Sequence, residues 1–369
     1  MANLRILRTN KITNFKMNFR TFFLVVVFGL FTVSVQAQTT IIDQGDCGAN
    51  GNNLTWILTY DGVDSILTIS GSGAMEDYDY NAYAPWYNYR TQMTTLIIGD
   101  SITTIGNYAF SGCTAFTGTL IIPNSVITIG ASAFSGCNGF TGTLTIPNSV
   151  TTIGVSAFIN CDNLTSVNIG NNVTTIVNTA FMHCLSLTSI NVNNENNTYS
   201  SENGVLFNKD KTTIILCPAG KIGNYLIPNS VTNVLYQAFF HCASLTSINV
   251  ESENNYFTSE DGVLFDKNMD TLICCPAGRI GGYIIPNNVK VIGNYSFGWC
   301  IELISITIPN GVIGIEPRAF SRCDALTSIT IPSSVTYIGE IAFPRTAANF
   351  INITNLNPIP GQTHLKFNP

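Results

Sequence analysis

The most regular feature of the chain is a pattern of apolar and polar positions that recurs about every 23 residues. One full copy, from Cys323 to Phe343, reads C-x-x-L-x-x-I-x-I-P-x-x-V-x-x-I-G-x-x-A-F. Ile329 and Ile331 lie two positions apart, so both point to one face of a short strand, and the residue between them points to solvent. Pro332 then ends the strand, because proline has no N–H to donate to a sheet. Each unit therefore predicts one short strand followed by a turn.

Eight units share an aromatic residue, usually in an Ala-Phe pair, and seven of them carry a cysteine three residues later. A period of 20–29 residues around L-x-x-I-x-I is typical of leucine-rich repeats. One coil cannot bury its apolar side alone, whereas stacked coils bury a continuous core. We therefore predict a mainly β fold: a leucine-rich-repeat solenoid of about 10 coils, with a parallel sheet on one face, little helix and an N-terminal β cap. The predicted core consists of Phe110, Phe134, Phe158, Phe181, Phe239, Phe297, Phe320, Phe343, Cys113, Cys137, Cys161, Cys184, Cys242, Cys300 and Cys323.

Two longer units interrupt the regular spacing and are copies of each other, offset by 58 residues. The segment 204–207 (G-V-L-F) recurs at 262–265, and Cys217-Pro218 recurs at Cys275-Pro276. Each copy holds two apolar runs around a polar turn, which is typical of a β-hairpin. We predict hairpin inserts near 198–217 and 256–275, protruding from the solenoid and each followed by an extra strand.

The two ends of the chain differ from the repeat. Residues 1–37 hold five basic residues, no acidic residue and an apolar run from Phe22 to Val33, which predicts a signal peptide. A membrane anchor is the alternative, but that run is shorter than the roughly 20 residues a spanning helix needs. Residues 38–92 lack the repeat and are predicted to form the N-terminal β cap. The solenoid is predicted over 93–346, and 347–369 is interpreted as a C-terminal tail or incomplete cap.

The repeat resembles that of the BspA-like leucine-rich-repeat surface proteins. The resemblance rests on the unit quoted above, on the G-V-L-F and C-P-A-G motifs of the inserts, and on the Leu-Thr-Ile-Ser-Gly-Ser-Gly segment at 67–73. It covers roughly residues 44–346. It implies an extracellular or cell-surface protein that adheres to host matrix proteins, receptors or other cells, and it supplies no catalytic residues to transfer.

Composition and charge restrict the classes of molecule that the protein is expected to bind. Charged residues make up 10% of the chain, whereas about a quarter is usual in soluble domains. Removal of residues 1–37 leaves 11 basic and 22 acidic residues, a net charge of −11. Such a surface repels nucleic acid and anionic lipid. The expected partners are therefore extracellular proteins, with glycans as the alternative, and we expect no membrane span once the signal is removed.

Candidate chemistry is sparse. We call the seven repeat cysteines the ladder cysteines. On adjacent coils they would lie about 4.8 Å apart, whereas the two Cβ atoms of a disulfide lie near 3.8 Å from each other. We therefore expect these cysteines to be small buried hydrophobic residues and not cross-links. His183 and His241 are expected on equivalent surface turns without a shared metal. The acidic turn at 266–270 lacks the glycine and glutamate of a calcium loop. We expect no catalytic, cofactor-binding or metal-binding residues; an enzyme scaffold is the weakest of the alternatives.

The remaining surface is the solvent-facing side of the predicted sheet and the inserts, because loops on a rigid scaffold commonly carry recognition. The candidate insert contacts are Tyr199, Tyr256, Phe257, Glu260 and Asp261. The candidate binding face consists of the outward strand positions Ile97, Ile121, Thr145, Asn168, Asn191, Leu226, Asn249, Ile284, Thr307 and Thr330.

Overall fold

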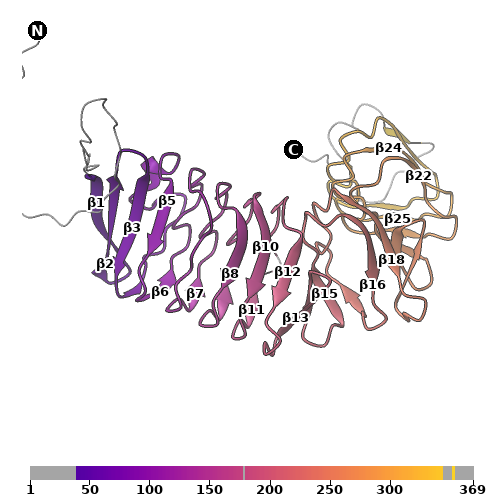
Figure 1. The fold of residues 1–369 in the computed structure, drawn as a ribbon. Helices are drawn as coiled ribbons and strands as arrows, with labels where there is room; N and C mark the ends of the chain where they lie inside the picture. Colours follow the sequence, from indigo (N-terminus) through magenta and orange to yellow (C-terminus); the bar gives the residue numbers. More distant parts are fainter. Residues whose placement is uncertain (1–38, 178, 344–350, 354–369) are drawn as a thin grey trace, which may run out of the picture.

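The structure is a computed structural model that describes residues 39–177, 179–343 and 351–353. Short strands stack into an elongated, curved solenoid, with β1 at one end and β24 near the other (Figure 1). Among the described residues, the one helical element is a 3₁₀ turn at Tyr87–Tyr89. The predicted fold class is confirmed: the body is a nearly all-β parallel solenoid of about 10 coils. The predicted signal peptide and most of the C-terminal tail lie outside the described residues.

The N-terminal segment is an antiparallel meander. Strands β1 (Thr40–Gly48), β2 (Gly51–Tyr60) and β3 (Ser65–Gly71) pair in sequence, and β3 then pairs in parallel with β5 (Thr95–Ile98). Trp86 is buried and stacks on Phe110 with ring centroids 5.5 Å apart. The meander therefore covers the first apolar layer of the solenoid. Trp86 adds one more aromatic ring before Phe110, the first of the repeat phenylalanines.

The L-x-x-I-x-I segments form the front sheet. Its parallel strands pair in register, so that Thr145, Asn168 and Asn191 lie side by side. The front sheet is divided into separate sheets, because the coil at 117–122 forms only an isolated bridge and because each insert separates two front strands. The front strands after β5 are β8 (Gly142–Ile146), β10 (Leu164–Ile169), β12 (Ser189–Val192), β16 (Gly223–Ile227), β18 (Leu245–Val250), β22 (Gly281–Ile284), β24 (Leu303–Thr307), β26 (Ile329–Ile331) and β28 (Ile351–Ile353).

The V-x-x-I segments form a second set of very short parallel strands along another side of the coils. Most of these strands hold two residues, and four of the two-residue strands are followed directly by a glycine: Gly130, Gly154, Gly293 and Gly339. They are β4 (Gly73–Ala74), β6 (Ile102–Ile105), β7 (Thr128–Ile129), β9 (Thr152–Ile153), β11 (Thr175–Ile176), β17 (Asn233–Val234), β23 (Val291–Ile292), β25 (Gly314–Ile315) and β27 (Tyr337–Ile338).

The inserts form hairpins, but they do not protrude as predicted. In the first, β13 (Tyr199–Glu202) and β14 (Val205–Asn208) are antiparallel, and β15 (Thr213–Leu216) then pairs in parallel with β17. The second repeats this arrangement with β19 (Phe257–Glu260), β20 (Val263–Asp266) and β21 (Thr271–Cys274). Val205, Leu206 and Phe207 have no exposed area. We call a coil that contains one of these hairpins an insert coil, and every other coil a regular coil. An insert coil has no Ala-Phe turn of its own, so the hairpin supplies the apolar side chains that fill its interior.

The repeat phenylalanines form two ring stacks. Phe110, Phe134, Phe158 and Phe181 stack with centroids 5.2 to 5.4 Å apart. A second stack joins Phe297, Phe320 and Phe343 at 5.0 and 5.5 Å. The interruption between them coincides with the two inserts, which contribute no ring at this position.

The ladder cysteines are buried and act as hydrogen-bond donors. The Cys137 thiol donates to the Phe110 carbonyl at 3.0 Å, and the Cys161 thiol donates to the Phe134 carbonyl at 3.2 Å. Burial raises the pKa of Cys184 to about 12, so its thiol stays protonated at neutral pH. Each of these thiols therefore gives a buried carbonyl of the preceding coil a second hydrogen bond, beside the one that the carbonyl accepts from a backbone amide of its own turn.

Candidate functional site

The predicted binding face is largely exposed. Of its ten positions, nine are exposed to solvent, and Asn249 is half-buried. The Asn249 amide donates to the Asn224 carboxamide oxygen at 2.7 Å, and the Ser247 hydroxyl donates to the same oxygen at 3.0 Å. Asn249 is thus held in a network across β16 and β18 rather than pointing freely into solvent.

The middle of the front face, over β8, β10 and β12, is uncharged and polar. The Asn191 amide donates to the Asn168 carboxamide oxygen at 3.1 Å, and the hydroxyls of Thr143 and Ser166 are 2.7 Å apart. These bonds join equivalent positions of adjacent coils and hold the side chains in fixed rows. A shallow groove of about 260 Å³ runs over them and is lined by Thr145, Ile146, Asn148, Asn168, Ile169, Gly170, Asn191, Val192 and Asn193.

The front face changes character after each insert, where aliphatic side chains are exposed. Ile222 lies just before β16 and is 73% exposed, and Leu226 lies on β16 and is 48% exposed. Ile280 and Ile284 occupy the equivalent positions at β22 and are 78% and 74% exposed. Leu226 and Ile284 take outward positions of their strands, whereas Ile222 and Ile280 lie directly before the strands begin. We call these four residues the aliphatic set.

A cleft of about 530 Å³ lies between β18 and β22, beside the aliphatic set. The Arg279 guanidinium is largely buried there; it forms an ion pair with the Asp261 carboxylate and donates to the Asp261 carbonyl at 2.8 Å. It also lies 4.5 Å from the centre of the Tyr283 ring. The cleft is lined by Thr246, Ser247, Asn249, Asp261, Gly262, Gly278, Arg279 and Ile280.

The first insert carries a related but differently charged arrangement. Lys221 takes the place of Arg279 and donates to the carbonyl of Asn203, which replaces Asp261. Lys221 therefore has no carboxylate at the position equivalent to Asp261. The two inserts share a backbone design but present different charges on the front face.

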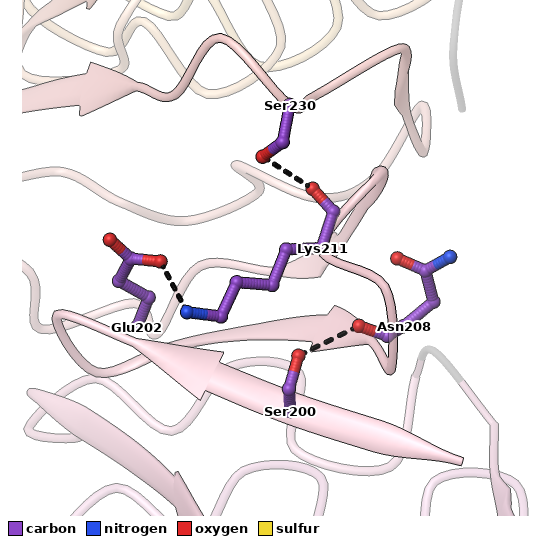
Figure 2. A network of polar contacts seen from close by, with 5 residues as sticks. All are labelled: Ser200, Glu202, Asn208, Lys211 and Ser230. Atoms are coloured by element: carbon purple, nitrogen blue, oxygen red, sulfur yellow. Dashed lines mark hydrogen bonds and ion pairs between the residues drawn. The ribbon is translucent and has the colours of Figure 1, made fainter. Parts of the chain in front are cut away.

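The hairpin of the first insert is tied to its surroundings by the polar contacts drawn in Figure 2. Lys211 forms an ion pair with Glu202 at 2.7 Å, and the Ser230 hydroxyl donates to the Lys211 carbonyl at 3.0 Å. The Ser200 hydroxyl donates to the Asn208 carbonyl at 2.8 Å. The bond to Ser230 joins the polar turn of the hairpin to the next coil.

The predicted insert contacts divide between surface and interior. Tyr256, Glu260 and Asp261 are exposed. Phe257 is buried, so its predicted place among the surface contacts is wrong, whereas Tyr199 is half-buried and stays a prediction. They occupy equivalent positions, the first residue of β19 and of β13, where strand alternation turns the side chain inward. Aromatic residues in both copies were the sequence signal for an interior position.

The histidines form a contact that sequence reasoning missed. The His183 and His241 rings have centroids 3.4 Å apart, and His241 lies 3.9 Å from the Trp299 ring. His241 is only 4% exposed, so its predicted place on a surface turn is wrong. Residues 183, 241 and 299 are spaced by 58, which was the available signal. Arg322 lies over Trp299 at 4.9 Å and completes what we call the ring column.

The surroundings of the ring column lower the pKa of both of its histidines. Burial, with smaller contributions from the positive charges of His183 and Arg322, lowers the pKa of His241 to about 3. Burial also lowers the pKa of His183, against the opposing effect of the Asp162 carboxylate. Both rings are therefore neutral at neutral pH. Within the described residues, no group of three or more His, Cys, Asp or Glu side chains is arranged to hold a metal ion.

The comparisons with known proteins agree with this geometry. The chain matches a family described as the BspA type leucine rich repeat region, in six copies over 84–210, 218–268 and 278–364. It is similar to a leucine-rich repeat protein from Eubacterium ventriosum ATCC 27560, with 22% identity and a TM-score of 0.51 over 87% of this chain and 97% of that one. A leucine rich cell surface protein from Faecalibacterium prausnitzii A2-165 is 20% identical, with a TM-score of 0.47 over 85% and 96% of the two chains.

Comparison with curated proteins finds no match. In the part of the chain that the structure describes, no helix has the length and apolar character to cross a membrane. The family match extends over more than half of the residues and coincides with the stacked coils. The chain belongs to the BspA-type leucine-rich-repeat family.

Proposed function

We propose that the protein is a secreted or cell-surface adhesion module that binds extracellular proteins through its front face and catalyses no reaction. The observation that carries this proposal is the aliphatic set, which exposes Ile222 and Leu226 at β16 and Ile280 and Ile284 at β22. Exposed apolar residues gathered on one face mark protein interaction sites more often than solitary ones do. Family membership supports an interaction role.

The cleft beside the aliphatic set adds polar specificity to this surface. Arginine and aromatic residues are frequent at the energetic centres of protein interfaces, and Arg279 is held there by Asp261 and Tyr283. Because Arg279 is already ordered, a partner would not have to immobilise it on binding, which reduces the entropic cost of association. The partner that fits is a protein surface with an apolar protrusion and a hydrogen-bonding rim.

Export is the second part of the proposal. It rests on the basic and apolar pattern of residues 1–37 and on the family. Expression of the full chain in a bacterial host, followed by cell fractionation and N-terminal sequencing of the product, tests it. Cleavage near Ala37 with recovery outside the cytoplasm is expected; an uncleaved cytoplasmic product would contradict export.

The binding proposal is tested by pull-down of residues 38–369 against purified extracellular matrix proteins and cell-surface fractions. The variant I222S/L226T/I280S/I284T is expected to lose capture at least tenfold. The control I127T/V155S/I313T makes the same kind of change at aliphatic residues that are about half exposed and lie outside the front strands. Equal loss in both variants would mean nonspecific adsorption, and no loss in either would exclude the front face.

The amide-lined groove over β8, β10 and β12 favours a second candidate, a glycan ligand. Amides and hydroxyls in fixed rows can donate to and accept from sugar hydroxyls without charge. A glycan array probed with the wild type and with N168A/N191A distinguishes this candidate. Glycan signals that disappear in N168A/N191A, but persist in the aliphatic-set variant, would favour a sugar ligand.

A further inference from the structure

Each insert coil holds a cysteine at the place where a regular coil has its repeat phenylalanine. In a regular coil the Phe158 amide donates to the carbonyl of Ala180, the residue directly before the next repeat phenylalanine. In the first insert coil the Cys217 amide makes this bond to the Ala238 carbonyl, and Cys275 makes the corresponding bond in the second. A thiol therefore stands in each insert coil at the position of the ring.

The ladder cysteine of the next coil lies against this position. In regular coils the ladder thiol donates to the carbonyl of the preceding coil's phenylalanine, as Cys161 does to Phe134 at 3.2 Å. Cys242 is the ladder cysteine after the first insert, and its sulfur lies 3.7 Å from the Cys217 carbonyl oxygen. The residue that a ladder thiol meets after an insert is thus a second cysteine.

The two sulfurs of the first insert lie close to the same oxygen atom. The Cys242 Sγ is 3.6 Å and the Cys217 Sγ is 3.9 Å from the Pro218 carbonyl oxygen. The two thiols also hydrogen-bond to each other, and this bond, together with burial, raises the pKa of Cys242 well above its ordinary value. Both residues have no exposed area.

The second insert repeats this arrangement. The Cys300 Sγ is 3.7 Å and the Cys275 Sγ is 3.9 Å from the Pro276 carbonyl oxygen, and these two thiols also hydrogen-bond to each other. The coil spacing that separates two ladder cysteines does not apply to either pair, because only one partner is a ladder cysteine and the other takes the phenylalanine position.

We propose that Cys217 with Cys242, and Cys275 with Cys300, form two disulfides when the protein folds in the presence of a disulfide oxidant. One cysteine thiolate attacks the oxidant disulfide and releases a thiolate, and the second cysteine thiolate then attacks the mixed disulfide and releases the other. Each pair loses two electrons and two protons, and the oxidant is reduced to two thiols. Burial keeps these thiols protonated in the folded protein, so the exchange precedes the packing of the insert coil.

The cross-links tie each insert coil to the coil that follows it. Cys217 and Cys275 lie five residues before Ile222 and Ile280, the first members of the aliphatic set on each side. The disulfides therefore anchor the segments that lead into β16 and β22. The pairing does not depend on adhesion or export, since the experiment supplies the oxidant.

The test counts thiols after refolding. The full chain is reduced and unfolded in guanidinium chloride, refolded with reduced and oxidised glutathione, denatured without reductant and alkylated with iodoacetamide. Two cross-links use four of the eleven cysteines, so seven are expected to be alkylated. Mass spectrometry of tryptic peptides then identifies the partners, because cleavage after Lys221, Lys267, Arg279 and Lys290 separates the four cysteines.

Three variants give the comparison. C217S is expected to leave Cys242 alkylated while the second cross-link remains, and C242S is expected to free Cys217 in the same way. C137S changes a ladder cysteine of a regular coil and is expected to keep both cross-links.

The proposal is overturned if all eleven cysteines of the refolded wild type are alkylated. Joined peptides that link other cysteines would exclude the pairing. Because Cys274 and Cys275 share a tryptic peptide, C274S is the check on the second pair; loss of its joined peptide would assign that cross-link to Cys274 and contradict the proposal.

Discussion

The regular coils and the insert coils of this solenoid are built from different contacts. A regular coil such as that of Phe158 stacks its ring on both neighbours and donates a thiol to the preceding coil's carbonyl. An insert coil has neither feature and fills its interior with hairpin residues such as Phe207 and Phe265. The difference shows that a solenoid can change its building unit without losing its axis, provided that the apolar volume of the coil is replaced.

The inserts are also where the surface departs from uniformity. The front strands that follow them carry the aliphatic set, the Arg279 cleft opens beside the second, and the ring column lies on the turns that they separate. Regular coils present rows of equivalent side chains, since each coil repeats the last. Function-bearing features are therefore expected at the inserts, where the repeat is broken.

The largest expected effect is the loss of stability when a stacked ring is removed, compared with the loss when an unstacked ring is removed. Phe158→Ala should lower the free energy of unfolding by about 3–5 kcal/mol, because it leaves a cavity and removes two stacked contacts. Phe239→Ala should cost about 1 kcal/mol less, because Phe239 meets Tyr225 in a tilted geometry instead of a stack. Urea denaturation measures both; equal losses would mean that stacking adds nothing to burial.

The second prediction concerns pH and the ring column. The folded-state pKa of His241 is about 3, whereas an unfolded histidine titrates near 6.5. Between these values the unfolded chain binds more protons, so stability falls as pH is lowered through this window and is unaffected by His241 above it. When the unfolded chain binds one proton more than the folded protein, the free energy of unfolding falls by about 2 kcal/mol between pH 6 and pH 4.5. Urea denaturation at several pH values should show a shallower slope for His241→Phe than for the wild type; an unchanged slope would contradict the assignment.

The third prediction compares two glycines with similar backbone angles. Gly204, at the hairpin turn of the first insert, has φ of 77°, and a Cβ there would meet the Ser189 Cβ at 2.9 Å. Gly223, at the start of β16, has φ of 79°, and a Cβ there would meet nothing within 4 Å. Gly223→Ala should cost about 1 kcal/mol from strain alone, and Gly204→Ala should cost more. Thermal unfolding of the two variants decides; the reverse order would mean that the hairpin turn is not packed against β12.

The smallest expected effect lies at the Lys211–Glu202 ion pair of Figure 2. Both side chains are about 40% exposed, so solvent and salt screen their attraction. Lys211→Met should change the free energy of unfolding by less than about 1 kcal/mol, and less still in high salt. A loss of several kcal/mol would show that the hairpin turn, rather than its apolar strands, holds the insert in place.

Much of the fold could be predicted from the sequence, because it depends on local periodicity. The two-residue spacing of Ile329 and Ile331 defines a strand face, and the repeated Phe and Cys define one side of every coil. Trp86 was the exception: it stands 24 residues before Phe110 and continues the stack, but neither its residue type nor its Pro85 neighbour follows the repeat.

The sequence by itself determined the coil, its period and the identity of the stacked side chains, because these follow from contacts between positions that repeat at a fixed spacing. The tertiary structure decided what happens where that spacing changes. The direction in which the hairpins fold, the burial of Phe257 and the contact between His183 and His241 all depend on how an insert coil packs between two regular ones. Such contacts join non-equivalent positions, so no periodicity encodes them, and only the packing of neighbouring coils fixes their geometry.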